Sequence, residues 1–101
     1  MVYASRRATI KLGKYQDALK WAKGIAEFLN KKYGTNYSVY TQLWGENPNS
    51  IIFWIGKYES MEQLLEISGK LNEDQEYITK LADSPSLFID GSVYDSVLEK
   101  H

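Results

Sequence analysis

The chain of 101 residues has no cysteine and only one histidine, His101, which is its last residue. Without cysteine there can be no disulfide bond, no thiolate nucleophile and no cysteine-ligated zinc site. A terminal histidine is a poor metal ligand or catalytic base, because chain ends are seldom ordered. The sequence therefore predicts no metal site, and it excludes a serine–histidine–acid triad.

Glycine-rich nucleotide-binding motifs are also missing. The sequence has neither G-x-G-x-x-G nor G-x-x-x-x-G-K-[ST], and it lacks the G-x-S-x-G nucleophile motif. It contains no run of about 18 apolar residues that could span a membrane. We therefore expect a soluble, cytoplasmic protein that needs no cofactor and has no membrane partner.

The formal net charge is only −1, but the two halves of the chain differ in sign. Residues 1–58 carry nine Lys or Arg and three acids, whereas residues 59–101 carry three Lys and ten acids. A nucleic-acid-binding protein would present a basic patch that can extend along the phosphate backbone. Here the basic residues fall mostly on one predicted helix and the second half offsets them, so we expect no nucleic-acid partner.

Hydrophobic periodicity predicts strands and helices in alternation. Runs rich in β-branched and aromatic residues predict four strands, over residues 2–11, 36–44, 51–58 and 92–98. A polar turn over residues 45–50 would join the second strand to the third. Apolar residues at helical spacing predict a helix over residues 15–32, which Gly34 would end.

A second helical region lies between the third and fourth strands. Ser60 and Gln63 have the spacing of a capping box, which predicts that a helix starts there. We expect Gly69 to end or kink this helix, and a second cap signal over residues 72–75 to start another. The residue pair Ser84-Pro85 would then end the helical region.

The order of these elements, βαββαβ, predicts one domain over residues 1–101 with an α+β fold. Right-handed crossovers would place both helical regions on one face of a four-stranded antiparallel sheet. The third strand is apolar on both faces, so the second face of the sheet also needs cover. Strand phasing assigns four large side chains to that face: Tyr40, Trp44, Ile52 and Trp54. A second copy packed sheet to sheet would cover them, which predicts a homodimer.

Two segments resemble a known group of proteins. Residues 6–14, Arg-Arg-Ala-Thr-Ile-Lys-Leu-Gly-Lys, are similar to the opening strand and turn of NipSnap-like proteins. Residues 58–64, Tyr-Glu-Ser-Met-Glu-Gln-Leu, are similar to a strand-to-helix junction shared across the dimeric α/β-barrel superfamily. The resemblance covers nearly the whole chain in pattern. It implies a ferredoxin-like sandwich that dimerises sheet to sheet into an α/β barrel.

Relatives of that fold have diverse activities, so the resemblance does not specify one. They include antibiotic-biosynthesis monooxygenases, haem-degrading oxygenases, lactone isomerases, polyketide cyclases and small ligand-sensing modules. This chain departs from the haem-degrading relatives, which hold iron with a histidine inside a helix, because its only histidine is terminal.

The candidate site is the inner face of the sheet. Strand phasing places eight candidate ligand-binding side chains there: Arg7, Thr9, Tyr40, Gln42, Trp44, Trp54, Tyr58 and Tyr94. Aromatic walls with a few polar groups suit a flat, mostly apolar ligand. Arg7 is the candidate anchor for an anion or a carbonyl group, or else forms a salt bridge between subunits. Asp90 or Asp95 could pair with Arg6 or Arg7 across the sheet.

Three hypotheses follow from these residues. The first is a homodimeric domain that binds a small apolar or aromatic molecule in a cavity between sheet and helices. The second is a cofactor-independent monooxygenase, cyclase or isomerase that acts on an aromatic or polyketide-like substrate and supplies Tyr or Arg as hydrogen-bond donors. The third is a structural assembly module with a filled core and no ligand. A cavity would separate the first two hypotheses from the third.

Overall fold

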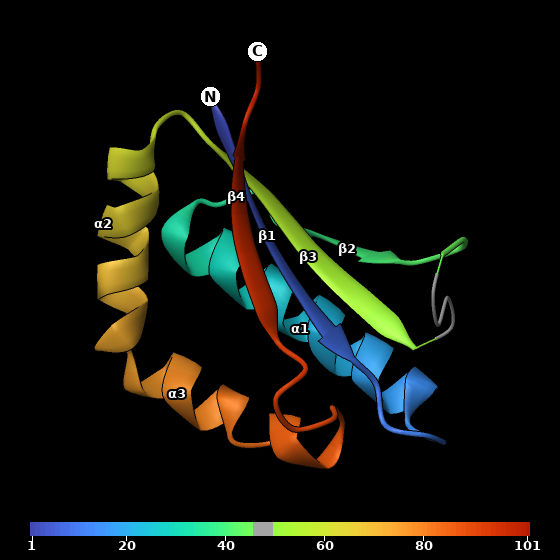
Figure 1. The fold of residues 1–101 in the computed structure, drawn as a ribbon. Helices are drawn as coiled ribbons and strands as arrows, with labels where there is room; N and C mark the ends of the chain where they lie inside the picture. The colour runs from blue at the N-terminus through green and yellow to red at the C-terminus, as the bar shows by residue number, and fades with distance from the viewer. Residues whose placement is uncertain (46–49) are drawn as a thin grey trace.

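A computed structural model describes residues 1–45 and 50–101 and has the predicted βαββαβ order (Figure 1). Its elements are β1 (Val2–Thr9), α1 (Tyr15–Tyr33), β2 (Ser38–Thr41), β3 (Ile51–Tyr58), α2 (Met61–Asn72), α3 (Gln75–Leu81), the short 3-10 helix η1 (Ser84–Ser86) and β4 (Tyr94–Glu99). The turn predicted over residues 45–50 falls mostly on residues 46–49, which lie outside the described residues. None of the described helices is both long and apolar enough to cross a membrane.

The four strands form one antiparallel sheet in the order β2-β3-β1-β4, with helices on one face. This is a ferredoxin-like α+β arrangement, so the predicted fold class is confirmed. In Figure 1, α1 runs behind the sheet, whereas α2 and α3 lie to the side of the edge strand β4. The helix-covered face of the sheet carries Val2, Ala8, Ile52 and Trp54 in the core.

Small residues on α1 bring this helix close to the sheet. Ala18, Ala22 and Ala26 are buried against β1 and β3, and Ile52 beneath them is fully buried. Trp54 fits into the same layer, where its indole Nε1 donates a 3.1 Å hydrogen bond to the Ala22 carbonyl oxygen. The apolar stripe predicted for residues 15–32 is therefore the face that packs on the sheet.

Several helix ends agree with their sequence signals, including the start of α3 at Gln75, which Asp74 caps. Gly34 ends α1 with φ of 67°, in the left-handed region that glycine adopts without strain. The Ser60 hydroxyl accepts from the Gln63 backbone N–H and caps α2. Gly69 does not end α2, which continues past it to Asn72. An exposed glycine weakens a helix by only about 1 kcal/mol, which the neighbouring turns can offset.

Two predicted strands end earlier than expected. β2 ends at Thr41, so Trp44 lies outside the sheet with 93% of its surface exposed. β1 ends at Thr9, and Ile10 continues only as an isolated bridge to Phe88. A prediction from sequence periodicity continues a strand for as long as apolar residues alternate. In the folded protein, the strand ends where its pairing with a neighbouring strand ends.

The register of β1 against β3 corrects part of the predicted phasing. Arg6 pairs with Trp54 and Arg7 pairs with Phe53, so Trp54 shares a face with Arg6 rather than with Arg7. Ile52, Trp54 and Tyr58 therefore face the helices, and their assignment to the free face was wrong. Phe53 and Ile55 take that place. Because β3 is apolar on both faces, its own pattern could not show which face meets the helices.

Candidate functional site

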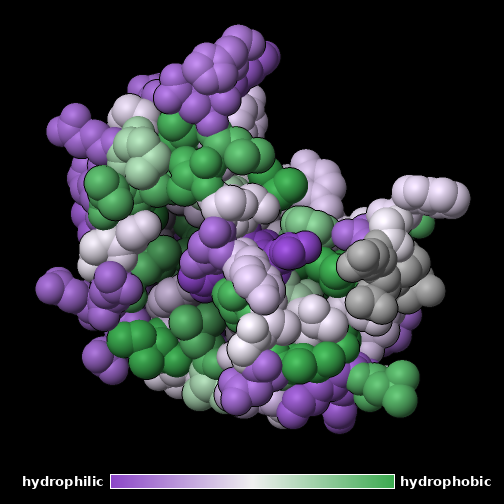
Figure 2. All heavy atoms as spheres, viewed as in Figure 1, coloured by the Kyte–Doolittle hydropathy of each residue, from purple (hydrophilic) through white to green (hydrophobic). Residues whose placement is uncertain are grey.

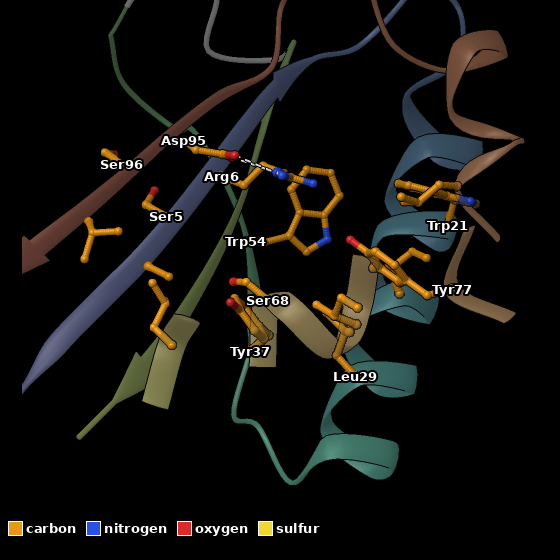
Figure 3. A pocket seen from close by; sticks show the side chains of 16 residues that line it. Ser5, Arg6, Trp21, Leu29, Tyr37, Trp54, Ser68, Tyr77, Asp95 and Ser96 are labelled. Carbon is orange, nitrogen blue, oxygen red and sulfur yellow. Dashed lines mark hydrogen bonds and ion pairs between the residues drawn. The ribbon is translucent and has the colours of Figure 1, made fainter. Parts of the chain in front are cut away.

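A cavity of about 210 Å³ lies between the helix-covered face of the sheet and the three α-helices (Figure 3). Strands β1, β3 and β4 line one side, and α1, α2 and α3 line the other. Most of the lining is apolar or aromatic, including Trp21, Leu29 and Trp54. The polar part of the wall includes Arg6 and Asp95, which sit on neighbouring strands.

The cavity exists because the elements around it pack loosely. Every residue of β4 is exposed, α3 has no buried residue, and α2 buries only Leu64. Val97 points from β4 toward the helices yet remains 42% exposed. Figure 2 shows apolar atoms on the surface near α2 and along the lower edge, with polar atoms between them. None of the described helices therefore seals the β4 edge of the sheet in the way that α1 seals its centre.

Arg6 and Asp95 form a two-point ion pair at the strand side of the cavity. Arg6 Nε lies 2.7 Å from Asp95 Oδ1, and Nη2 lies 2.9 Å from Oδ2. Hydrogen bonding to Arg6 holds the pKa of Asp95 below its usual range, and the carboxylate in turn raises the pKa of Arg6. Both groups stay charged around neutral pH, so the pair offers polar atoms without net charge. The predicted pairing of an arginine with Asp95 is confirmed for Arg6.

Two tyrosines form a pair of neutral hydroxyl groups, and Tyr37 of this pair lines the cavity. The hydroxyls of Tyr37 and Tyr58 lie 2.8 Å apart, and Asn30 anchors Tyr37 by bonds to its backbone N–H and carbonyl. Burial raises the pKa of Tyr37, and the bond to Tyr58 raises it further. Burial also raises the pKa of Tyr58. Neither phenol is therefore ionised near neutral pH, and neither can act as a tyrosinate base.

Tyr77 brings a third hydroxyl to the cavity from α3. Its ring stacks on Phe28 of α1, with centroids 6.4 Å apart and planes 7° apart. Figure 3 shows Tyr77 reaching toward the cavity beside Trp54. No hydrogen bond joins its hydroxyl to another described residue. This hydroxyl is thus available to a bound molecule.

An aromatic cluster forms the end of the cavity near α1. Trp21 and Trp54 meet edge to face at 6.1 Å between centroids, and Phe88 contacts both rings. The indole Nε1 of Trp21 donates to the Lys80 carbonyl oxygen at 3.2 Å, which ties α1 to α3. Trp21 and Trp54 thus have their polar atoms satisfied by the protein, and their rings present apolar surface to the cavity.

The eight residues predicted for the site separate into several groups. Arg7, Thr9, Gln42 and Tyr94 line a separate, more polar hollow of about 540 Å³, where the Arg7 guanidinium lies 5.0 Å from the Tyr94 ring centroid.

Tyr40 is half-exposed on the free face of the sheet, and Trp44 is exposed beyond the end of β2. Trp54 lines the cavity under the helices, and Tyr58 lies below it, bonded to Tyr37. The eight therefore do not form one site, because the real register places Trp54 and Tyr58 on the opposite face from Arg7.

Several cavity residues were not among the predicted site residues. Arg6, Tyr37 and Tyr77 line the cavity, and Asp95 was predicted only as an ion-pair partner. The consecutive arginines at positions 6 and 7 indicated that one arginine would face the helices, because successive side chains of a strand point to opposite faces. Only the register decides which of them meets the helices.

The polar groups of the cavity wall include hydroxyls and a paired guanidinium. In the described part of the chain, no group of three or more His, Cys, Asp or Glu could hold a metal ion. The cavity offers aromatic faces, hydroxyl groups and a paired guanidinium. These groups can orient a flat molecule and donate hydrogen bonds to its oxygen atoms.

Comparison with solved structures shows that this fold occurs in NIPSNAP domain proteins. An uncharacterized NIPSNAP domain protein from Burkholderia xenovorans has a TM-score of 0.80 and 19% identity, covering 100% of this chain and 95% of its own. A NIPSNAP family protein of unknown function from Agrobacterium tumefaciens has a TM-score of 0.79 and 18% identity, covering 99% of this chain and 87% of its own. The fold-level resemblance to NipSnap-like proteins is therefore confirmed.

An antibiotic biosynthesis monooxygenase also has this fold, with a TM-score of 0.71 and 8% identity over 100% of this chain and 99% of its own. At these identities the likeness establishes the fold and not the activity. No protein-family model matches the sequence, and no curated protein matches it significantly.

Proposed function

We propose that this protein binds a small, mostly apolar or aromatic molecule in the cavity between the sheet and the helices. The observation that carries the proposal is the cavity itself, with its apolar lining and aromatic end. An apolar cavity of about 150 Å³ holds benzene, and sites for drug-sized ligands have about 300–1,000 Å³. A cavity of about 210 Å³ therefore suits a molecule with one or two rings.

A cofactor-independent enzyme of the monooxygenase, cyclase or isomerase kind is the second candidate. The fold it shares with an antibiotic biosynthesis monooxygenase favours this reading. The protein would then position a reactive aromatic or polyketide-like substrate and donate hydrogen bonds from Arg6 or Tyr77 to a developing oxyanion. The raised pKa values of Tyr37 and Tyr58 argue against a tyrosine base, so binding is the better-supported function.

A purely structural module with a filled core is less well supported, because a filled core would leave no cavity of this size. The cytoplasmic location expected from the sequence stays a prediction.

A homodimer is part of the same proposal. On the free face of the sheet, Phe53 and Ile55 are only partly buried, and Tyr40, Tyr94 and Leu98 are 51%, 60% and 61% exposed. Soluble proteins seldom leave such a contiguous apolar face open. A second copy packed on this face would cover it and close the two sheets toward a barrel.

The binding proposal can be tested by NMR titration with acetophenone, a one-ring molecule. The indole N–H signals of Trp21 and Trp54 should shift saturably, because both rings line the cavity. The signal of Trp44 is an internal control, since that residue is 93% exposed. Ser68→Phe should fill the cavity and weaken binding about tenfold or more, whereas Leu65→Phe on the exposed side of α2 should not. Shifts at Trp44 alone, or none at all, would contradict the proposal.

The dimer can be tested with two adjacent variants in β3. Phe53→Asp should give a folded monomer by native mass spectrometry and circular dichroism, because its side chain lies on the free face. Trp54→Asp should unfold the protein, because it buries a charge under α1. A Phe53→Asp protein that remains a dimer would show that the interface lies elsewhere. Native spectra of wild-type protein purified without denaturant would also reveal any small molecule that it retains.

A further inference from the structure

The charged part of the cavity wall is an ion pair that is complete before any molecule binds. Among the described residues that line the cavity, Arg6 and Asp95 are the charged ones. Their side chains are 46% and 57% exposed, and both residues line the cavity. A molecule that enters therefore meets both charges together rather than an isolated cation.

The ion pair leaves hydrogen-bond donors unused. A guanidinium group has five N–H donors in a planar fork, and the contacts with Asp95 use one on Nε and one on Nη2. Three N–H groups of Arg6 remain for another acceptor. The Tyr77 hydroxyl reaches the same cavity from α3, and no hydrogen bond joins it to a described residue. Figure 3 shows the side chains of both residues beside the Trp54 indole.

The Asp95 carboxylate affects how well an acidic molecule can bind beside Arg6. A carboxylate that approached the free N–H groups of Arg6 would also approach the negative charge on Asp95, which lies within 3 Å of the guanidinium. The attraction and the repulsion largely cancel. A neutral carbonyl or phenol oxygen takes the same hydrogen bonds without that repulsion.

Building on the function proposed above, we propose that the Arg6–Asp95 pair makes this cavity selective for neutral molecules that carry an acceptor oxygen. Arg6 donates to that oxygen, and Asp95 discriminates against carboxylates of the same size. The class of molecule is thus a small aromatic ketone or phenol, with its ring against Trp54 and Trp21. Asp95 determines the charge selectivity, because its carboxylate repels a second carboxylate at Arg6.

Three one-ring probes of similar shape separate the contributions: acetophenone with a neutral acceptor, benzoate with a charged one, and cumene with none. Wild-type protein should bind acetophenone and cumene, and should bind benzoate about tenfold more weakly than acetophenone. Dissociation constants come from titrations that follow the indole signals of Trp21 and Trp54.

Two substitutions with matched controls test the roles of the pair. Arg6→Met should weaken the binding of acetophenone about tenfold and leave the binding of cumene unchanged. Arg7→Met, on the opposite face, should change the binding of neither probe. Asp95→Asn should strengthen the binding of benzoate about tenfold and leave the binding of acetophenone within about twofold. The substitution removes the repulsion between two carboxylates and keeps the N–H donors of Arg6. Asp90→Asn, an exposed acid that does not line the cavity, is its control. Circular dichroism confirms that each variant is folded.

The possible failures are distinguishable. If no probe shifts the signals of Trp21 and Trp54, the cavity is not a binding site and the proposed function itself fails. If acetophenone and cumene bind, but Arg6→Met affects them equally and Asp95→Asn leaves benzoate unchanged, the cavity binds molecules by its apolar lining alone. That second result would overturn the selectivity inference and keep the proposed function.

Discussion

Replacing Gly56 by alanine tests how tightly the structure packs below the cavity. Gly56 faces the helices from β3, and the ring of Tyr37 covers it. An added Cβ would lie 2.6 Å from Cε1 of Tyr37 and 2.8 Å from its Cδ1 and Cζ. Carbon atoms pack at about 3.5–4.0 Å, so the ring would have to retreat by roughly 1 Å. Bonds to Asn30 and to the Tyr58 hydroxyl restrict that movement.

The expected cost follows from two opposing effects. Overpacking of this kind costs about 1–3 kcal/mol, and the lower chain entropy of unfolded alanine returns about 0.4–1 kcal/mol. Gly56→Ala should therefore lower the free energy of unfolding by about 1–2 kcal/mol, measured by urea denaturation followed by circular dichroism.

Gly24→Ala provides the matched control, because a Cβ at this exposed position of α1 meets nothing within 4 Å. It should stabilise the protein by about 1 kcal/mol, through helix propensity alone. Adding Tyr37→Leu to the Gly56→Ala protein should recover part of the loss, as a double-mutant cycle would show. If Gly56→Ala were as stable as the wild type, the packing described for Tyr37 would be refuted.

Two further predictions concern the helix caps. Asp74 caps α3 and pairs with Lys32 at 2.7 Å, and this contact, followed by the bond from Tyr33, holds its pKa well below the ordinary value. The ionised Asp74 carboxylate contributes fully to the free energy of unfolding above the ordinary carboxyl pKa. This contribution declines as the pH falls below that value, and it is lost once the pH falls through the lower pKa of the folded protein. The gap in urea midpoint between wild type and Asp74→Asn should thus shrink as the pH falls from about 5 to about 3, and a constant gap would contradict this linkage. Ser60→Ala removes the cap of α2 and should cost about 1 kcal/mol, seen by calorimetry as a melting temperature lower by about 4–8 °C; an unchanged melting temperature would mean that the cap contributes nothing.

Signals that depend on a few neighbouring residues predicted the elements well. β3 has the predicted bounds of residues 51–58, and the helix predicted over residues 15–32 differs from α1 by one residue. The capping role of Ser60 and the turn at Gly34 were also predicted correctly. Each of these features is set by local backbone preferences and by which side chains alternate, so the chain carries them without reference to distant partners.

The candidate site was predicted less well, because it depends on contacts between distant segments. Shifting β1 against β3 by one residue moves a whole set of side chains to the other face. β3 is apolar on both faces, so its sequence is compatible with either choice. The observed register joins Arg6 to Trp54 and leaves Arg7 with Phe53 on the free face. Half of the predicted set, including Arg7 and Tyr94, consequently lines a different hollow from Trp54.

The sequence by itself determined the order of strands and helices, and with it the α+β fold, because periodicity and capping are local properties. The tertiary structure decided which arginine meets the helices, and it created the cavity. That cavity arises where α2 and α3 stand off from the edge strand β4, with Arg6 and Asp95 brought together from opposite ends of the chain. Register and the spacing between layers are set by the balance of packing over the whole molecule, which no single segment encodes.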